Sequence, residues 1–487
     1  MKTWNSAEVM TPAEVAKIHN QALKILSEIG VYVANDELLD IFAANGAEID
    51  KTKQVAKFPV AWMEKFISES SEEFDDDDTM ETSCLFPWKK RSTYSGGIEA
   101  TAGTYPVFYL NLEGEYVPHT TKTMSDMARL ADALPNITRI GVTGVPSDVP
   151  TELDTLYMRL VAWKNAKNKL SGCGEVHEPR LIPYILEMGK IMAAYKGEPE
   201  TRYTFAEVEL LSPLRLGSFE AETVLRFWKA GYRAGIGHMQ ISGASAPATL
   251  AGTLTLTVAE SLFVCVLYRL LYGWKKLYIQ SNASVLDMRV GYFPFARPER
   301  GLLILAAGQM ARFYKAAAWT SAIGVDSKAI DMEAGLGHSF NSVLAVMAGS
   351  IGLECFGNPS AGDANSPILL VIENEYLGAI RRFMKGFEVN DDTLAWDLIK
   401  ERGIGGSFLD AEHTVEHFRQ EHWQPELMTR VPLNDWLVSG KETIEQKARE
   451  KVEAIYKDYN PNAIDEATET ALMSVIKRAG RDLGITS

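Results

Sequence analysis

Several short apolar segments of this sequence end in side chains that can do chemistry. These residues are Thr143, Glu175, His177, Glu207, Glu209, His238, Gln240, Gln280, Ser281, Asn282, Asp326 and Asn358. Carboxylates and imidazoles can move protons, and amides can orient a small substrate by hydrogen bonds. A single polar residue of this kind is usually structural. Their recurrence at the same end of successive segments predicts a site, but it does not indicate which reaction.

Other reaction types lack their usual patterns. His177, His238 and His338 are far apart in the sequence, and no HxH, HExxH or CxxC spacing was identified, so we expect no metal site. No GxSxG motif precedes a helix, which disfavours a serine hydrolase. No GxGxxG follows a predicted strand, which disfavours a dinucleotide site.

Aromatic residues also gather near the ends of the predicted strands or in the loops that follow. They are Tyr94, Tyr105, Phe108, Tyr292, Phe293, Phe295, Trp319 and Phe356. One interpretation is that these rings anchor loops. The other is a cage for a quaternary ammonium ion, which ring faces attract. A betaine would also need a partner for its carboxylate, and the candidates are Arg297, Arg300, Arg312, Lys328 and His338.

Composition limits the class of protein. The 487 residues are 46% hydrophobic and carry a formal charge of −15, which favours a large core and disfavours nucleic acid or an anionic membrane as partner. We identify no membrane span and no signal peptide. The four cysteines are far apart, which is typical of free thiols in a reducing cytoplasm.

The elements that must position these residues alternate regularly. Strand-like segments occur near residues 98–110, 137–145, 169–176, 203–210, 234–242, 275–284, 319–325 and 353–358, with helical segments between them. Eight such units predict an α/β fold with a parallel sheet closed into a (β/α)8 TIM barrel, with an open doubly wound sheet as the alternative. We predict an N-terminal helical region with an acidic loop at 1–90, the barrel at 91–386 and a C-terminal helical appendage at 387–487.

The stretch "WTSAIGVDSKAIDMEAG" (319–335) illustrates the expected arrangement. It begins as an apolar strand and then becomes charged before the next helix. In such barrels the loops at the carboxyl ends of the strands line the active-site rim. We therefore expect Asp326 and its neighbours to lie on that rim.

Several sequence blocks together resemble the trimethylamine methyltransferase family of corrinoid-dependent enzymes. They include "IHNQALKILSEIGVYV", "GASAPATLAGTLTLTVAESL", "VLDMRVGY", "DSKAIDMEAG" and "IENEYLGAIRRFMKGFEVNDDTLAWDLI". The resemblance implies a TIM barrel that moves a methyl group from a methylated amine to the cobalt of a separate corrinoid protein. It implies no tightly bound cofactor in this chain, because the partner protein supplies the corrinoid.

One departure narrows the expected substrate. The trimethylamine enzymes carry pyrrolysine, and this chain has only standard residues. It is therefore more similar to the glycine betaine methyltransferase branch, whose members act on quaternary amines. We expect glycine betaine as substrate, with proline betaine, carnitine or γ-butyrobetaine as alternatives.

The resemblance and the residue types together suggest site residues. For catalysis we predict His338, Glu207 and Gln280. For substrate binding we predict Tyr94, Tyr105, Trp319, Phe356, Asn282 and Gln240.

Two other functions stay open. One is a barrel lyase or isomerase that uses the carboxyls of Glu175 and Glu207 as acid and base. The other is a family member that binds a betaine without catalysis. In every case we expect a cytoplasmic homo-oligomer.

Overall fold

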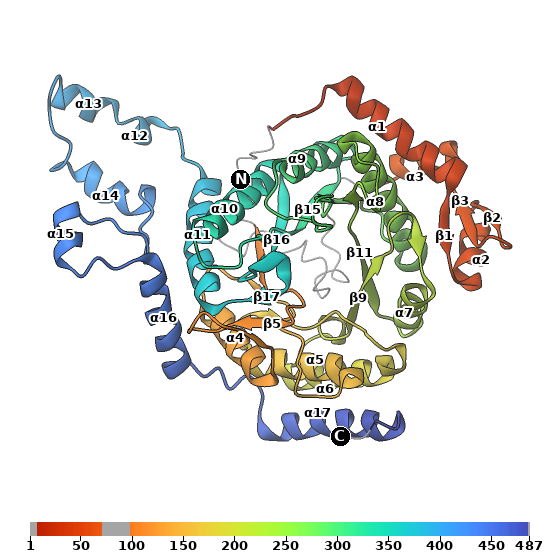
Figure 1. Ribbon diagram of the computed structural model, residues 1–487. Coiled ribbons are helices and arrows are strands. Elements are labelled where there is room, and N and C mark those ends of the chain that lie inside the picture. Colours follow the sequence, from red (N-terminus) through yellow and green to blue (C-terminus); the bar gives the residue numbers. More distant parts are fainter. Residues whose placement is uncertain (1–6, 71–97, 486–487) are drawn as a thin grey trace.

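The computed structural model describes residues 7–70 and 98–485. In it, strands and helices alternate along the chain from Glu99 to Lys385, with the strands at the centre and the helices around them (Figure 1). The central strands are β4 (Glu99–Ala102), β7 (Arg139–Ile140), β8 (Leu170–Ser171), β9 (Phe205–Leu210), β11 (Arg233–His238), β13 (Tyr278–Gln280), β15 (Ala317–Ala322) and β16 (Ser350–Phe356). The surrounding helices are α4 (Thr121–Ala133), α5 (Asp154–Asn165), α6 (Ile182–Lys196), α7 (Ser218–Lys229), α8 (Leu250–Tyr272), α9 (Pro298–Phe313), α10 (Met332–Ala348) and α11 (Pro367–Lys385).

The central strands pair in parallel. Six of them form one sheet in the order β13-β15-β16-β4-β7-β8, and β9 pairs with β11. An isolated parallel bridge between Glu175 and Glu207 joins the chain after β8 to β9. The predicted α/β class with a parallel sheet is therefore confirmed.

The last junction, between β11 and β13, differs from the closed barrel that the sequence predicts. Within the described ranges no backbone ladder joins these two strands. Side chains bridge them instead: the Tyr278 hydroxyl donates to the Ile236 carbonyl at 3.2 Å, and the His238 N–H donates to Gln280 Oε1 at 3.2 Å. At this junction, side-chain hydrogen bonds therefore take the place of direct backbone pairing.

Helix α8, one of the surrounding helices, is mostly buried inside the protein. It is long and apolar enough to cross a membrane, in contrast to the expectation that no segment qualifies, but 83% of its most apolar window is buried inside the protein. It packs against α1 (Pro12–Lys24), α9 and β13. These contacts place α8 in the protein core.

The sequence predicts a helical N-terminal region, but the structure shows that this region also contains strands. Besides α1, α2 (Asp36–Ala44) and α3 (Val60–Ser68), it contains β1 (Val31–Val33), β2 (Glu48–Asp50) and β3 (Val55–Lys57). These strands and β10 (Arg215–Leu216) form a small separate sheet in the order β10-β1-β3-β2. The acidic run at 71–83 lies outside the described residues.

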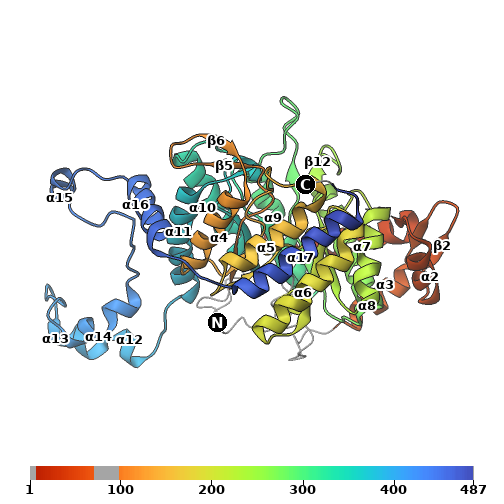
Figure 2. The same cartoon turned by 90° about the horizontal axis from the view of Figure 1, so that it is seen from below.

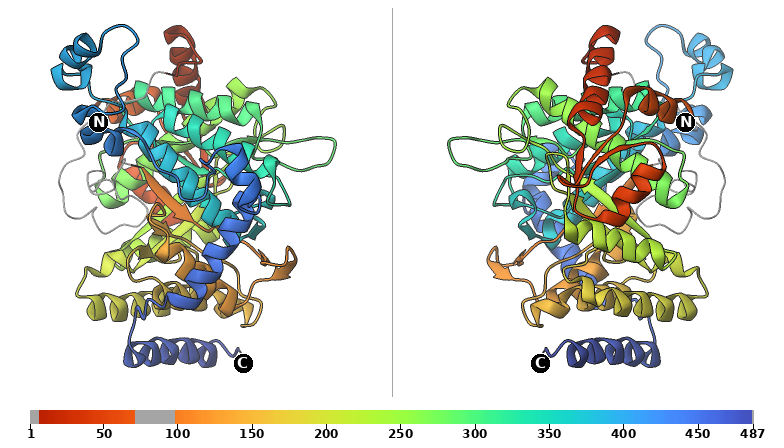
Figure 3. Two further views of the ribbon diagram at one scale, coloured as in Figure 1. Left: turned by 90° about the vertical axis from the view of Figure 1, so that its left-hand side faces the viewer. Right: turned by 90° about the vertical axis from the view of Figure 1, so that its right-hand side faces the viewer.

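The C-terminal region combines packed and projecting helices. Helix α16 (Ile444–Asp458) packs on α11 and α4, and α17 (Glu466–Asp482) packs on α6 and α5. Between α11 and α16, helices α12 (Asp391–Leu394), α13 (Trp396–Arg402), α14 (Glu412–Glu421) and α15 (Leu433–Val438) project from the body (Figures 2 and 3). Apolar side chains stay exposed on this projection, among them those of Leu394, Trp396, Ile399, Ile404, Leu409, Val415, Leu433 and Val438.

Close packing of α9 against α10 depends on a glycine. A Cβ atom on Gly308 would overlap the Ala348 carbonyl oxygen and lie 2.7 Å from the Ala348 Cβ. Because part of this obstacle is backbone, α9 and the end of α10 would have to move apart.

We therefore expect Gly308→Ala to lower the free energy of unfolding by about 1–3 kcal/mol through overpacking. Gly335→Ala is the matched control, because nothing lies within 4 Å of a Cβ at that position in α10. We expect the control to be neutral or stabilising by about 0.5–1 kcal/mol. Denaturant midpoints of both variants test this, and equal midpoints would contradict it.

Candidate active site

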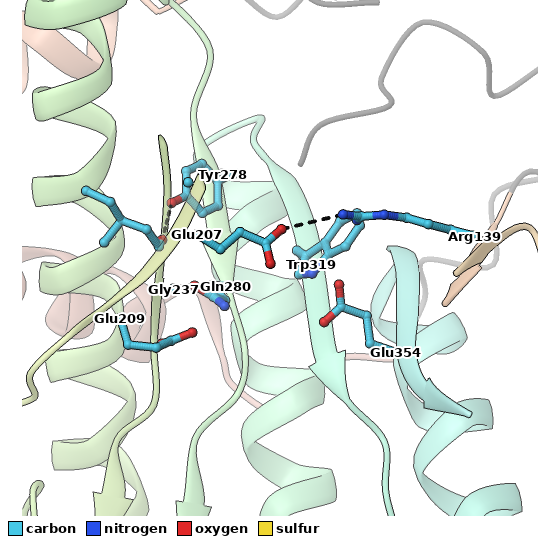
Figure 4. Close-up of a pocket in the computed structure, with 10 residues that line it drawn as sticks. Arg139, Glu207, Glu209, Gly237, Tyr278, Gln280, Trp319 and Glu354 are labelled. Carbon is cyan, nitrogen blue, oxygen red and sulfur yellow. Dashed lines mark hydrogen bonds and ion pairs between the residues drawn. The ribbon is translucent and has the colours of Figure 1, made fainter. Parts of the chain in front are cut away.

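A cavity of about 110 Å³ lies among the central strands (Figure 4). Its lining residues are Arg139, Glu207, Glu209, Gly235, Ile236, Gly237, Tyr278, Gln280, Trp319 and Glu354. Half of them come from β11 and β13, so the cavity lies where the backbone ladder is interrupted. All ten belong to strands and not to the loops beyond them.

Glycines provide the room for the larger side chains of the cavity. A Cβ on Gly237 would overlap the Glu209 carboxylate, and a Cβ on Gly174 would lie 2.6 Å from the carboxyl carbon of Glu207. A Cβ on Gly352 would lie 2.5 Å from the Trp319 ring. Small residues on neighbouring strands thus allow glutamates and a tryptophan to occupy an interior that branched aliphatic residues usually fill.

Arg139 is the centre of the charge arrangement. Its guanidinium lies 3.6 Å from the Glu99 carboxylate and 3.5 Å from the Glu207 carboxylate, and its side chain is only 8% exposed. Burial raises the pKa of Glu99 to about 7, although the charge of Arg139 opposes this increase. One guanidinium is therefore shared between two carboxyl groups.

Three further glutamates, Glu175, Glu209 and Glu354, lie near this pair. Desolvation, followed by repulsion from Glu207, raises the pKa of Glu209 to about 8, although this residue keeps an exposed surface. Burial also raises the pKa of Glu354 to about 8, against the attraction of Arg139, and raises the pKa of Glu175 well above its usual range. Desolvation therefore favours the neutral, protonated form of these three carboxyl groups.

The structure brings three of the sequence-predicted residues together. Glu207, Gln280 and Trp319 all line the cavity, and they come from β9, β13 and β15. Gln280 also has a positioning role, because its side-chain oxygen accepts the His238 N–H across the β11–β13 junction.

Gln240 and Asn282 are buried and do not line this cavity. Gln240 donates to Glu260 and to His238 Nδ1, and its oxygen accepts from the Thr257 hydroxyl at 2.8 Å. The Asn282 carbonyl accepts from Arg300 at 3.3 Å.

His338 and Phe356 form a second buried pair, with stacked rings whose centroids are 6.4 Å apart. His338 Nε2 lies 2.6 Å from a carboxylate oxygen of Glu373. Neither ring lines the cavity.

Tyr105 is exposed and lies beside His177, which pairs with Asp154 at 2.9 Å. It too is absent from the cavity lining. Tyr94 lies outside the described residues.

The loop after β15 lines a surface groove of about 1180 Å³ between residues 287–298 and 326–340. Asp326 accepts the backbone N–H groups of Phe295 and Ala296, both at 2.8 Å. Its charge therefore fixes the conformation of the neighbouring loop, besides lining the groove.

Sequence reasoning missed Arg139, Glu99 and Glu354 as members of the site. Each is a charged residue inside an otherwise apolar strand, in "ITRIG", "GIEATAG" and "GLECFG". A charge at such a position is rarely buried without a partner, and that signal could have identified them.

A possible metal-binding group lies elsewhere. Among the described residues, Asp392, His413 and His417 are the group whose ligand atoms all lie within 4.8 Å of one another. The two histidines are four residues apart on α14, a spacing that sequence reasoning overlooked.

Comparison with known proteins identifies the family. The family model of trimethylamine methyltransferase (MTTB) matches residues 1–484. The chain belongs to this family. It is 25% identical over 484 residues to trimethylamine methyltransferase MttB of Desulfitobacterium hafniense. The aligned region covers 97% of this chain and 94% of that protein.

Two further relatives are equally distant. Glycine betaine methyltransferase of Desulfitobacterium hafniense is 26% identical over 98% of both chains. Trimethylamine methyltransferase MttB of Methanosarcina barkeri is 26% identical over 97% of this chain and 95% of its own. The chain is therefore a methyltransferase, as the sequence resemblance had predicted.

The raised carboxyl pKa values predict a dependence of stability on pH. The pKa of Glu209 and of Glu354 is about 8 in the folded protein and 4.5 ordinarily, so between these pH values the folded chain binds more protons than the unfolded chain. The contribution of these groups to stability is therefore complete below the lower value and is lost as pH rises towards the upper one.

We expect the variant Glu209→Gln/Glu354→Gln to lose less stability than the wild type between pH 6 and pH 9, because its side chains stay neutral. Urea denaturation at both pH values measures this. Glu453→Gln, on the exposed face of α16, is the matched control and should behave as the wild type. An equal loss in the double variant and the wild type would contradict the assignment.

Proposed function

We propose that this methyltransferase moves a methyl group from a small quaternary amine to Co(I) of a separate corrinoid protein. The observation that carries the proposal is the cavity, in which more carboxyl groups than cationic groups surround the Trp319 ring. A quaternary ammonium ion supplies the missing positive charge and has methyl groups that pack on a ring face. The named relatives, which are methyltransferases for trimethylamine and glycine betaine, support the same chemistry.

The reaction requires little of the protein beyond binding and orientation. Co(I) attacks a methyl carbon, a Co–C bond forms, and the C–N electron pair stays on nitrogen. The nitrogen leaves as a neutral tertiary amine and needs no proton. The tasks left to this chain are to hold the ammonium ion in line for attack and to exclude water.

The residues of the cavity divide these tasks. The carboxyls of Glu207, Glu209 and Glu354 face the ammonium charge, and Trp319 offers its ring to the methyl groups. Gln280 acts as a positioning residue, since it holds β13 next to β11.

We also propose that the side-chain bridges between β11 and β13 complete a (β/α)8 barrel. Seven of the eight junctions are formed by backbone pairing or the Glu175–Glu207 bridge, and the eighth by Tyr278 and Gln280. The amine then lies inside the barrel and not only at its rim.

Glycine betaine is the donor that the sequence resemblance favours, and proline betaine, carnitine and γ-butyrobetaine are its alternatives. The corrinoid protein is the proposed partner. The cytoplasmic location and the homo-oligomer stay predictions.

Trp319→Ala should weaken donor binding by about tenfold or more, because a desolvated cation–ring contact is worth about 2 kcal/mol. Trp319→Phe keeps a ring and should lose less. Trp396→Ala removes a tryptophan that is 67% exposed on the projecting helices and should leave binding unchanged. Calorimetry measures the affinities, and the absorbance of Co(I) measures transfer.

An unchanged affinity of the Trp319→Ala variant for the methyl donor would contradict a role of the Trp319 ring in binding. The same assay separates the other functions. A lyase or isomerase using Glu175 and Glu207 would turn over its substrate without any corrinoid protein, whereas a non-catalytic relative would bind the amine and leave Co(I) unmethylated.

A further inference from the structure

The charges and the size of the cavity restrict the chemical class of the methyl donor more narrowly than membership of the family does. We infer that the methyl donor is a compact quaternary ammonium cation whose remaining substituent carries no carboxylate, and not a betaine. This inference rests on the proposed function, because it concerns the ligand of the same site.

The first argument is the excess of acidic groups. Glu207, Glu209 and Glu354 line the cavity, and Arg139 is the one lining residue with a permanent positive charge in the described part of the chain. A betaine brings equal positive and negative charge and would leave this imbalance as it is. A carboxyl-free cation reduces it.

The second argument is that Arg139 is already engaged. Glu99 and Glu207 lie 3.6 and 3.5 Å from its guanidinium. A betaine carboxylate would have to compete with these two groups, and it would do so next to further carboxyl groups. Like charges at such short range in a buried site repel strongly.

The third argument is that the other cations considered as partners for a betaine carboxylate lie elsewhere. Arg300 is fully buried over the Phe295 ring at 4.6 Å, and Lys328 donates to the Asp326 carbonyl at 2.6 Å. Arg312 donates to the backbone carbonyls of Ala348 and Ala7.

The other two candidate partners for a betaine carboxylate, Arg297 and His338, also have partners elsewhere. Arg297 pairs with Asp287 at 3.1 Å, and His338 lies against Glu373. None of the five residues lines the cavity.

The fourth argument is size. The cavity measures about 110 Å³, whereas an engineered apolar cavity of about 150 Å³ holds one benzene molecule in another protein. A trimethylammonium group with a short substituent is of this order. Carnitine and proline betaine are larger, and they would need the strands to separate further.

The positions of the acidic groups are specified by the sequence around them. Gly174 and Gly237 leave the space in which the carboxyls of Glu207 and Glu209 lie. The acidic lining residues therefore come from two strands, β9 and β16, and from no loop.

Calorimetry on the full-length protein at about pH 8 tests the inference without a corrinoid protein. The ligands are tetramethylammonium, choline, glycine betaine and 3,3-dimethyl-1-butanol, the uncharged carbon analogue of choline. We expect the two cations to bind at least about tenfold more tightly than glycine betaine, a difference typical of one charged contact. The uncharged analogue should not bind measurably.

Glu354→Gln should weaken binding of choline by about tenfold and reduce its advantage over glycine betaine, since it removes one acidic group. Glu453→Gln, a substitution of an exposed glutamate on α16, should change neither affinity. The circular dichroism spectrum of each variant establishes that it has folded. Binding of glycine betaine as tight as that of choline, or no binding of any ammonium compound, would overturn the inference.

Methyl transfer to Co(I), followed with the same ligands, separates this inference from the proposed function. Transfer from glycine betaine and not from the cations would overturn the inference and support the function. Tight binding of the cations with no transfer from any donor would support the preference of the cavity for carboxyl-free cations and contradict the proposed methyl transfer.

Discussion

Among the residues that the structure describes, carboxyl groups outnumber cationic groups in the lining of the cavity between the central strands. The guanidinium of Arg139 pairs with the carboxyl groups of Glu99 and Glu207, and the carboxyl groups of Glu175, Glu209 and Glu354 lie nearby with raised pKa values. Charges buried in this way are unfavourable unless they are paired or neutralised. Protonation relieves part of the repulsion in the free protein, and in the proposed function a bound cation relieves it in the complex. Affinity for a permanently charged amine is then a property of the interior itself.

Because no backbone ladder joins β11 and β13 in the described part of the chain, the interior between the central strands has room for a ligand. A complete ladder would bring the two backbones to within hydrogen-bonding distance and leave room for packed side chains only. Tyr278 and Gln280 hold the strands together by their side chains, and the cavity lies beside them. Behind β13 the buried helix α8 supports the junction, because the hydroxyl of its Tyr268 accepts the Ile236 N–H at 2.6 Å. The outer helices thus fix the geometry of a site that none of them lines.

Much of the fold could be predicted from the sequence, because the alternation of strands and helices is a local property. Glu207, Gln280 and Trp319 could also be predicted as site residues, because each is a polar or aromatic residue within an apolar segment. The interrupted junction was not, because it depends on side chains from strands about forty residues apart in the chain. Arg139 and Glu99 were missed because attention to strand ends overlooks charges inside strands. The N-terminal strands were missed because each has only three residues, as in Val31–Val33, and one of them pairs with Arg215 and Leu216 far along the sequence.

The central claim is that the carboxyl groups lining the cavity receive the charge of the donor, and proton release on binding tests it most directly. Titration of the protein with tetramethylammonium near pH 7, in buffers of different ionisation enthalpy, counts the protons exchanged. Because a cation favours the ionised form of nearby carboxyls and so lowers their pKa, and because the pKa of Glu209 and of Glu354 is about 8 beforehand, the account predicts a net release of protons. Binding with no proton release, or with proton uptake, would contradict it.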